Sequence, residues 1–277
     1  MKFQLFILLN IFFLIFSSVG DISAFDKDLQ KIINTYTEDF QSKFTKIFKD
    51  GPIYSGDGTA YGMITEAGNC LFPKDPKDEY YGDMMFAALN HDQYIDDMGC
   101  GLCALVVSTS NPYKPIRVRI IDQCPECEHG SLDFSDKAFK ELTNMDPSRV
   151  KITWAIIPCD VEVLDFPPLV ETNSDIKFKF KIGSTRYWFE VQAFYTKYPI
   201  SLVEMETNGE FYELERKPYN YWARKEGNGI DIGEGPYTFR VTLADSTVIL
   251  AENVEMVVPA DDEDSDYATG VQSIIQN

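Results

Sequence analysis

The distribution of cysteines constrains this chain more than any other feature. The chain has six of them, at Cys70, Cys100, Cys103, Cys124, Cys127 and Cys159. Two pairs have the form Cys-x-x-Cys, and 20 residues separate Cys103 from Cys124, which is also the spacing of a four-cysteine zinc site. Spacing alone does not choose among the possible pairings. It does predict that the first part of the chain is a small, covalently clamped domain.

The N-terminus favours disulfides over zinc. Residues 1–20 have the form of a secretory signal, in which Lys2 precedes an apolar core from Phe3 to Phe16 and small residues follow. We expect cleavage after Gly20, with Ala24 as the alternative. A secreted protein folds in an oxidising compartment, where disulfides are the default, so we expect no metal. The apolar run is short for a membrane span, so we expect a soluble extracellular protein.

The charge of the chain limits its partners. The formal net charge is -19 at pH 7. Nucleic acid and anionic membrane surfaces both require a basic face, so neither is expected as a partner. A neutral ligand fits this composition better.

Apolar periodicity and turn signals divide the chain into segments, and they predict a mainly β protein with an N-terminal helical extension. The predicted segments are a signal peptide at 1–20, an amphipathic helical extension at 21–51, a small β-barrel domain at 52–163, a proline-containing linker at 164–174, an all-β sandwich at 175–259 and a disordered acidic tail at 260–277.

Individual elements follow from the same patterns. In the barrel domain we predict extended segments at 59–64, 102–109, 116–121 and 150–157, a brief helix within 81–90, and a helix at 135–143 with Ser135 as its N-cap. In the sandwich we predict strands at 176–182, 187–194, 200–206, 211–214, 237–243 and 247–253. The Asn208-Gly209 pair predicts a hairpin turn.

Asp122 and Asp133, which flank the motif Cys124-Pro-Glu-Cys127, are candidate catalytic residues. Asp133 lies between Leu132 and Phe134, and such burial raises the pKa of a carboxyl group. Asp122 follows a strand that alternates as a half-buried strand does. Two acids in different environments are typical of polysaccharide chemistry. The alternative is that Asp133 caps the helix near Ser135 and that Asp122 is a turn residue.

Several short motifs, taken in order, resemble the expansin family. They are Gly58–Gly62, Gly99–Cys103, Leu132–Ser135, Ser184–Trp188 and Lys197–Pro199. The resemblance extends from Pro52 to Pro259. It implies a six-stranded double-psi β-barrel, similar to that of the family-45 inverting endoglucanases, followed by an immunoglobulin-like carbohydrate-binding β-sandwich.

The resemblance also implies site residues and disulfides. The expected groove residues are Thr59, Tyr61, Asp122 and Asp133, and the expected binding platform comprises Lys181, Tyr187, Trp188 and Tyr219. A row of aromatic rings binds flat sugar faces without charge. Tyr187 and Trp188 share a face only if their strand is irregular, because neighbouring residues on a regular strand point to opposite sides. By analogy, the disulfides are Cys70–Cys100, Cys103–Cys159 and Cys124–Cys127.

The expected function is non-hydrolytic. In the endoglucanase family a catalytic base stands where this chain has Met63, and a thioether cannot activate water. Asp57 could replace that base only if it points into the groove. We therefore expect a monomeric, cofactor-free protein that binds cellulose or a related glucan and loosens a cell wall or extracellular matrix. The alternatives are a matrix or coat protein that binds without loosening and, third, an inverting endoglucanase.

Overall fold

The computed structural model describes most of the chain beyond residue 52. The described residues are 34–35, 53–62, 68–72, 85–94, 98–110, 113–163, 166–171, 174–225, 231–260 and 267–275. Contacts divide the chain into two units, Met1–Tyr36 and Thr37–Asn277, and every strand described below belongs to the second. The predicted signal, nearly all of the predicted helical extension, and Met63 lie outside the described residues. The predicted boundaries between segments remain predictions.

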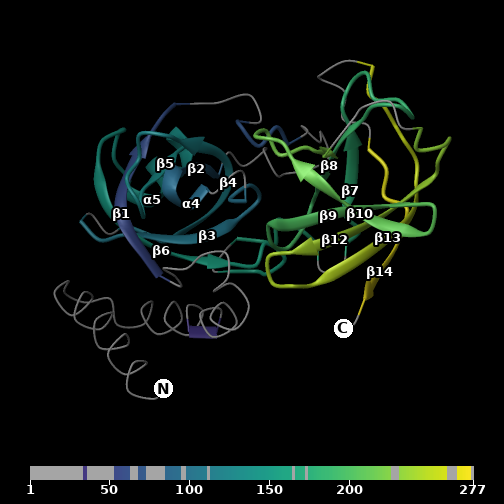
Figure 1. The fold of residues 1–277 in the computed structure, drawn as a ribbon. Helices are drawn as coiled ribbons and strands as arrows, with labels where there is room; N and C mark the ends of the chain where they lie inside the picture. Colours follow the sequence, from purple (N-terminus) through teal and green to yellow (C-terminus); the bar gives the residue numbers. More distant parts are fainter. Residues whose placement is uncertain are drawn as a thin grey trace. The chain divides into compact units, whose positions relative to one another are not determined.

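Six strands form a closed barrel (Figure 1). They are β1 (Ile53–Ala60), β2 (Phe86–Asn90), β3 (Cys103–Ser108), β4 (Ile116–Cys124), β5 (Leu132–Phe134) and β6 (Val150–Ile157). Their order around the barrel is β1-β5-β2-β4-β3-β6. The pairs β1–β5 and β2–β4 are parallel and the remaining pairs are antiparallel. The prediction of a six-stranded barrel is confirmed.

Strand β4 is more buried than its alternation predicts. Ile116, Val118 and Ile120 are buried, but so are Arg117 and Arg119. The guanidinium group of Arg117 lies over the ring of Phe166, and that of Arg119 lies over the ring of Phe72. The two outward-facing arginines are therefore covered by segments outside the barrel, which local periodicity does not reveal.

The helix predicted within 81–90 is wrong for residues 86–90, which form β2. Helix α4 (His91–Tyr94) begins only after this strand. Residues 86–90 have good helix formers, but all five are buried between β4 and β5. Ladder pairing on both sides outweighs the local helix propensity.

Helix α5 (Asp136–Thr143) agrees with its prediction. The Oγ atom of Ser135 accepts a hydrogen bond from the backbone N of Ala138 at 3.1 Å, so Ser135 is the N-cap. Asp133 is therefore free of the capping role that was the alternative to a place in the groove. Asn144 adopts a left-handed conformation at the C-terminal end of the helix.

Three disulfides cross-link the barrel. They join Cys70 to Cys100, Cys103 to Cys159 and Cys124 to Cys127, which is the pairing implied by the resemblance. The four cysteines with zinc-site spacing thus belong to three different bonds. None of the helices in the described part of the chain has the length and apolar character needed to cross a membrane.

The second half is an eight-stranded sheet in the order β14-β13-β12-β9-β10-β11-β8-β7 (Figure 1). Its strands are β7 (Lys177–Phe180), β8 (Glu190–Phe194), β9 (Ile200–Thr207), β10 (Glu210–Arg216), β11 (Trp222–Arg224), β12 (Tyr237–Leu243), β13 (Val248–Val254) and β14 (Val271–Ile275). The ring of Phe178 on β7 stacks on that of Phe239 on β12, with centroids 5.1 Å apart. The sheet therefore curls over a shared apolar core. The Asn208-Gly209 turn has positive φ at both residues, as its hairpin prediction requires.

The disordered tail predicted at 260–277 is wrong for residues 267–275. Strand β14 pairs with β13 along five residues. Gln272 adds a side-chain anchor, because it accepts from the backbone N of Ile176 and donates to the carbonyl of the same residue. The acidic run at residues 261–264 dominates the composition of the tail, whereas the β-branched residues that follow it form the edge strand.

Candidate functional site

Asp133 and Thr59 face each other on neighbouring parallel strands of the barrel. They are paired in the register of β1 and β5, and the Oγ1 atom of Thr59 donates a hydrogen bond to Oδ1 of Asp133 at 2.5 Å. Burial between Leu132 and Phe134 raises the pKa of the Asp133 carboxyl group, and the negative charge of Glu126 adds to this effect. The hydrogen bond from Thr59 and the charge of Arg149 oppose it. The net shift is upward, so Asp133 keeps its proton to higher pH than an ordinary aspartic acid.

A cavity of about 400 Å³ includes Asp133 and Thr59 in its lining. The other polar residues that line it include Asp57, Glu126, Glu128 and Arg149. The Cys124–Cys127 disulfide forms part of the same wall, and its two sulfur atoms and a carboxylate oxygen of Asp133 all lie within 4.8 Å of one another. The short Cys-Pro-Glu-Cys loop thus brings Glu126 to the same cavity as Asp133.

Tyr61 has a buried hydroxyl group with no hydrogen-bond partner among the described residues. Burial raises the pKa of Tyr61, and the charges of Asp122 and Asp133 raise it further. Tyr61 therefore stays neutral at physiological pH. Tyr61 is not among the residues that line the cavity of Asp133, and the described residues supply no acceptor for its buried hydroxyl group.

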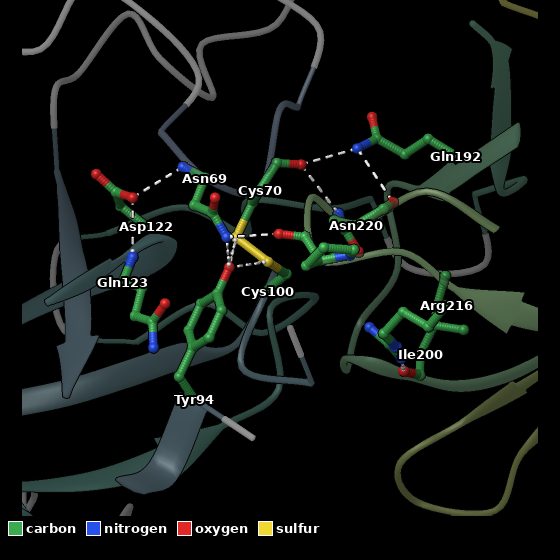
Figure 2. Close-up of a disulfide and its surroundings, with 11 residues drawn as sticks. Asn69, Cys70, Tyr94, Cys100, Asp122, Gln123, Gln192, Ile200, Arg216 and Asn220 are labelled. Carbon is green, nitrogen blue, oxygen red and sulfur yellow. Dashed lines mark hydrogen bonds between the residues drawn. A yellow bond between two sulfur atoms is a disulfide. The ribbon is translucent and has the colours of Figure 1, made fainter. Parts of the chain in front are cut away.

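Asp122 organises the backbone beside the groove. Its Oδ1 atom accepts hydrogen bonds from the backbone N of Asn69 and from the backbone N of Gln123, both at 2.8 Å (Figure 2). Asp122 lies within β4 and is therefore not a simple turn residue. Its position lets it hold the segment at Asn69 while its charge acts on Tyr61.

Two further carboxyl groups bear on the chemistry of this cavity. Asp57 pairs with Arg149 at 2.9 Å and with Lys151, and these two cations lower its pKa. Asp57 is therefore a weak base. Glu126 is exposed and lines the cavity, and it is a residue that our sequence reasoning missed. Its position between the two cysteines of a short disulfide loop is the signal that could have identified it.

Tyr187 and Trp188 lie in a turn and not in a strand, because β8 begins only at Glu190. Backbone hydrogen bonds from Thr185 N to Trp188 O at 2.6 Å and from Trp188 N to Thr185 O at 3.2 Å close the turn. Strand alternation therefore does not apply to this pair. The Tyr187 side chain is 53% exposed, and Trp188 is partly exposed.

Lys181 and Tyr219 form a second cluster through Glu190. The Nζ atom of Lys181 lies 2.8 Å from Oε2 of Glu190 and 4.2 Å from the ring centroid of Tyr219. The hydroxyl group of Tyr219 donates to Glu190 at about the same distance, 2.9 Å. Glu190 is buried, and sequence reasoning missed it. It fixes the position of the partly exposed Tyr219 ring.

Tyr221 and Trp222 belong to the core. Their side chains are 5% and 3% exposed. Together with Tyr187, Trp188 and Tyr219, these two residues form an aromatic excess in the sequence that favours a binding surface, and for Tyr221 and Trp222 this expectation is wrong.

The loop Pro218–Asn220, which contains Tyr219, is hydrogen-bonded to Asn69 and Cys70 (Figure 2). The Nδ2 atom of Asn69 donates to the carbonyl of Pro218 at 3.0 Å. The carbonyl of Cys70 accepts from Nδ2 of Asn220 at 3.1 Å and from Nε2 of Gln192 at 2.8 Å. Residues 69–70 thus contact Asp122 on one side and the loop of Tyr219 on the other.

Known proteins resemble this chain in sequence and in fold. The Bacillus subtilis protein Expansin-YoaJ is 25% identical over 191 residues, which cover 69% of this chain and 73% of that protein. The Dictyostelium discoideum Expansin-like protein 1 is 27% identical over 179 residues, which cover 61% of this chain and 58% of that protein. No family model matches the chain.

Two crystal structures of Clavibacter michiganensis expansin share the fold. One is the apo protein and the other is a point mutant in complex with cellohexaose. Each has a TM-score of 0.60 and 25% sequence identity, and each match covers 78% of this chain and 95% of the other. The sequence relatives and the solved structures therefore agree with the resemblance found in the motifs.

Proposed function

We propose that this chain, which its relatives identify as an expansin-like protein, binds cellulose or a related glucan and loosens polysaccharide networks without hydrolysing them. The observation on which this rests is the Asp133–Thr59 pair in the lining of a cavity, where burial raises the pKa of the Asp133 carboxyl group. The cellohexaose complex of the Clavibacter protein supports the ligand class. The motif resemblance and the three disulfides support an extracellular protein.

The groove acts on hydrogen bonds in this proposal. A protonated carboxyl group both donates and accepts hydrogen bonds, and the hydroxyl group of Thr59 does the same. Glucan chains adhere to one another through hydroxyl–hydroxyl hydrogen bonds. A groove that offers Asp133 and Thr59 replaces some of those bonds with bonds to the protein, so that one chain slips past its neighbour. No covalent bond forms or breaks.

Glu126 favours a second candidate function, an inverting glycoside hydrolase. Inverting hydrolysis needs a proton donor and a base roughly 6.5–9.5 Å apart, with water between them. Asp133 would be the donor. Among the described carboxylates that line the cavity, Asp57 is paired with two cations, whereas Glu126 and Glu128 are both exposed. Of these two, Glu126 is the one whose charge raises the pKa of Asp133. Glu126 is therefore the residue to test for a base. A glucan-binding matrix or coat protein without loosening activity is the remaining alternative.

A binding assay on crystalline cellulose, run beside a reducing-end assay, tests the proposal. We expect the protein to bind cellulose and to weaken a cellulose network or extend a wall strip under load without steady release of reducing ends. Binding without any extension would favour the matrix or coat protein. Steady release of reducing ends that disappears in both Glu126→Gln and Asp133→Asn would establish the hydrolase and overturn the proposal.

Loosening should decline as pH rises. The folded-state pKa of Asp133 is raised, so the protonated form is present below this pKa and is lost as pH rises through it. Extension should therefore be highest in acid and should fall as pH rises through a pKa above that of an ordinary aspartic acid, while cellulose binding by neutral aromatic rings should change little. Glu126→Gln removes a negative charge that raises the pKa of Asp133, so the fall should move to lower pH. Extension rates across a pH series measure both effects, and a flat profile would contradict the role of protonated Asp133.

A further inference from the structure

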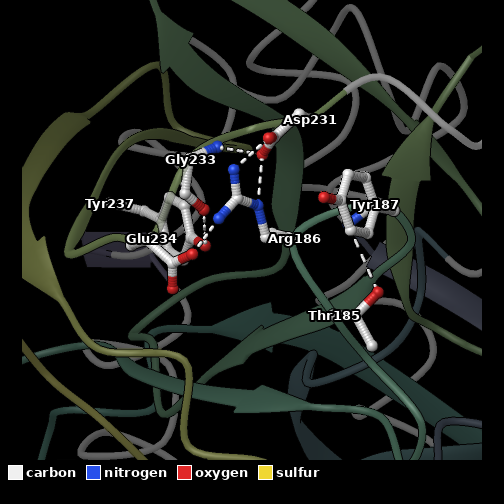
Figure 3. Close-up of polar contacts among 7 residues, drawn as sticks. All are labelled: Thr185, Arg186, Tyr187, Asp231, Gly233, Glu234 and Tyr237. Atoms are coloured by element: carbon white, nitrogen blue, oxygen red, sulfur yellow. Dashed lines mark hydrogen bonds and ion pairs between the residues drawn. The ribbon is translucent and has the colours of Figure 1, made fainter.

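The turn that holds Tyr187 and Trp188 also contains an arginine with three acidic contacts. The Nε atom of Arg186 donates to Oδ1 of Asp231 at 2.6 Å, and its Nη2 atom donates to Oδ2 of the same carboxylate. Its Nη1 atom pairs with Glu234. Figure 3 shows the guanidinium group directed toward both acids. This is a two-pronged contact of the kind that fixes the plane of a guanidinium group.

The acidic segment is itself anchored to the turn and to the core. The backbone N of Ile232 donates to the carbonyl of Arg186 at 2.9 Å. Asp231 accepts from the backbone N of Gly233 at 2.9 Å, and the hydroxyl group of Tyr237 donates to the carbonyl of Gly233 at 2.9 Å (Figure 3). Tyr237 begins β12 and is buried. Residues 231–234 thus connect the turn to the sheet.

The guanidinium group of Arg186 also lies against the Tyr187 ring. Its Cζ atom is 5.3 Å from the ring centroid, within the range of a cation–π contact. Arg186 supports one face of a ring that is 53% exposed, which leaves the opposite face for a sugar. The Arg186 side chain is itself 34% exposed, and exposed ion pairs contribute little to stability. Such an arrangement suits orientation of the ring better than stabilisation of the fold.

We propose that Arg186, Asp231 and Glu234 are positioning residues of the glucan-binding surface, and that their ion pairs hold the Thr185–Trp188 turn so that the Tyr187 ring is oriented for stacking on a sugar. This inference rests on the proposed function. It explains why an arginine paired with two acids lies in the turn that carries the exposed Tyr187 ring. Lysine cannot replace Arg186, because an ammonium group is not planar. It can neither form two parallel hydrogen bonds with a carboxylate nor stack on a ring.

A double-mutant cycle tests the inference. Binding of cellohexaose and of amorphous cellulose is measured for the wild-type protein, Arg186→Gln, Tyr187→Ala and the double variant. We expect Arg186→Gln to weaken binding about threefold, from loss of one ring-supporting contact. In the Tyr187→Ala background the same change should have no further effect, because Arg186 acts through that ring. Arg186→Lys should resemble Arg186→Gln.

Arg240→Gln is the matched control. Arg240 makes a similar two-pronged pair with Glu204 and lies over the ring of Phe211, between strands β12 and β9. Its loss should leave binding unchanged. Normal binding by Arg186→Gln, or equal weakening with and without Tyr187, would overturn the inference. Either result leaves the proposed function intact if the wild-type protein binds, whereas failure of the wild-type protein to bind either glucan overturns both.

Discussion

Asp133→Asn is expected to abolish loosening while cellulose binding stays at the wild-type level. The amide keeps the size of the carboxyl group and still accepts the hydrogen bond from Thr59 Oγ1. It has no acidic proton to share with a glucan hydroxyl or a bridging oxygen. The amide N–H group is a weaker hydrogen-bond donor to a glucan oxygen than the carboxyl O–H group that it replaces, so extension should fall to background. In the proposed function, binding depends on the aromatic residues of the second sheet, so it should not change.

The measurement is extension of a wall strip or cellulose composite under constant load, with binding isotherms for the same preparations. Asp136→Asn is a matched control, because Asp136 lies on the first turn of α5, three residues from Asp133, and outside the residues that line the cavity. That variant should extend walls normally. Full extension by Asp133→Asn would remove the groove acid from the mechanism, and a parallel loss of binding would show that Asp133 acts in adhesion instead.

Trp222→Ala is expected to lower the free energy of unfolding by about 3–5 kcal/mol, the usual range for removing a large buried aromatic side chain. The Trp222 ring is 3% exposed, and the guanidinium group of Arg216 lies 4.3 Å from its centroid. Trp222 pairs with Val191 on β8 and with Arg216 on β10, so removal of its ring would leave an empty space in the middle of the sheet. Neighbouring strands cannot close around it without losing their register.

Trp188→Ala is the informative comparison, because the same substitution falls on a turn at the surface. It should change the free energy of unfolding by less than about 1 kcal/mol, yet weaken cellulose binding by roughly tenfold. Urea denaturation and cellulose binding, measured on both variants, separate the two roles. A stable Trp222→Ala protein that fails to bind cellulose would show that Trp222 belongs to the binding surface. An unstable Trp188→Ala protein would show that Trp188 belongs to the core.

Sequence alone determined the features that depend on local pattern. Apolar patterning predicts the barrel strands β3, β4 and β6, because a half-buried strand repeats every two residues and a fully buried strand is a short apolar run. Ser135 marks the start of α5, because a side-chain oxygen there satisfies a free backbone N–H group. Leu132 and Phe134 also predict the burial that raises the pKa of Asp133, because they accompany it wherever the strand goes.

Tertiary structure alone decided the features that depend on distant partners. Residues 86–90 became a strand because β4 and β5 flank them, and Trp222 entered the core because β8 and β10 enclose it. Asp231 pairs with Arg186 across 45 residues of sequence, a separation that no local pattern spans. Burial and charge pairing arise only when segments that are distant in the sequence pack together. A sequence names the groups that can take part, and only the pairing of the strands determines which of them meet.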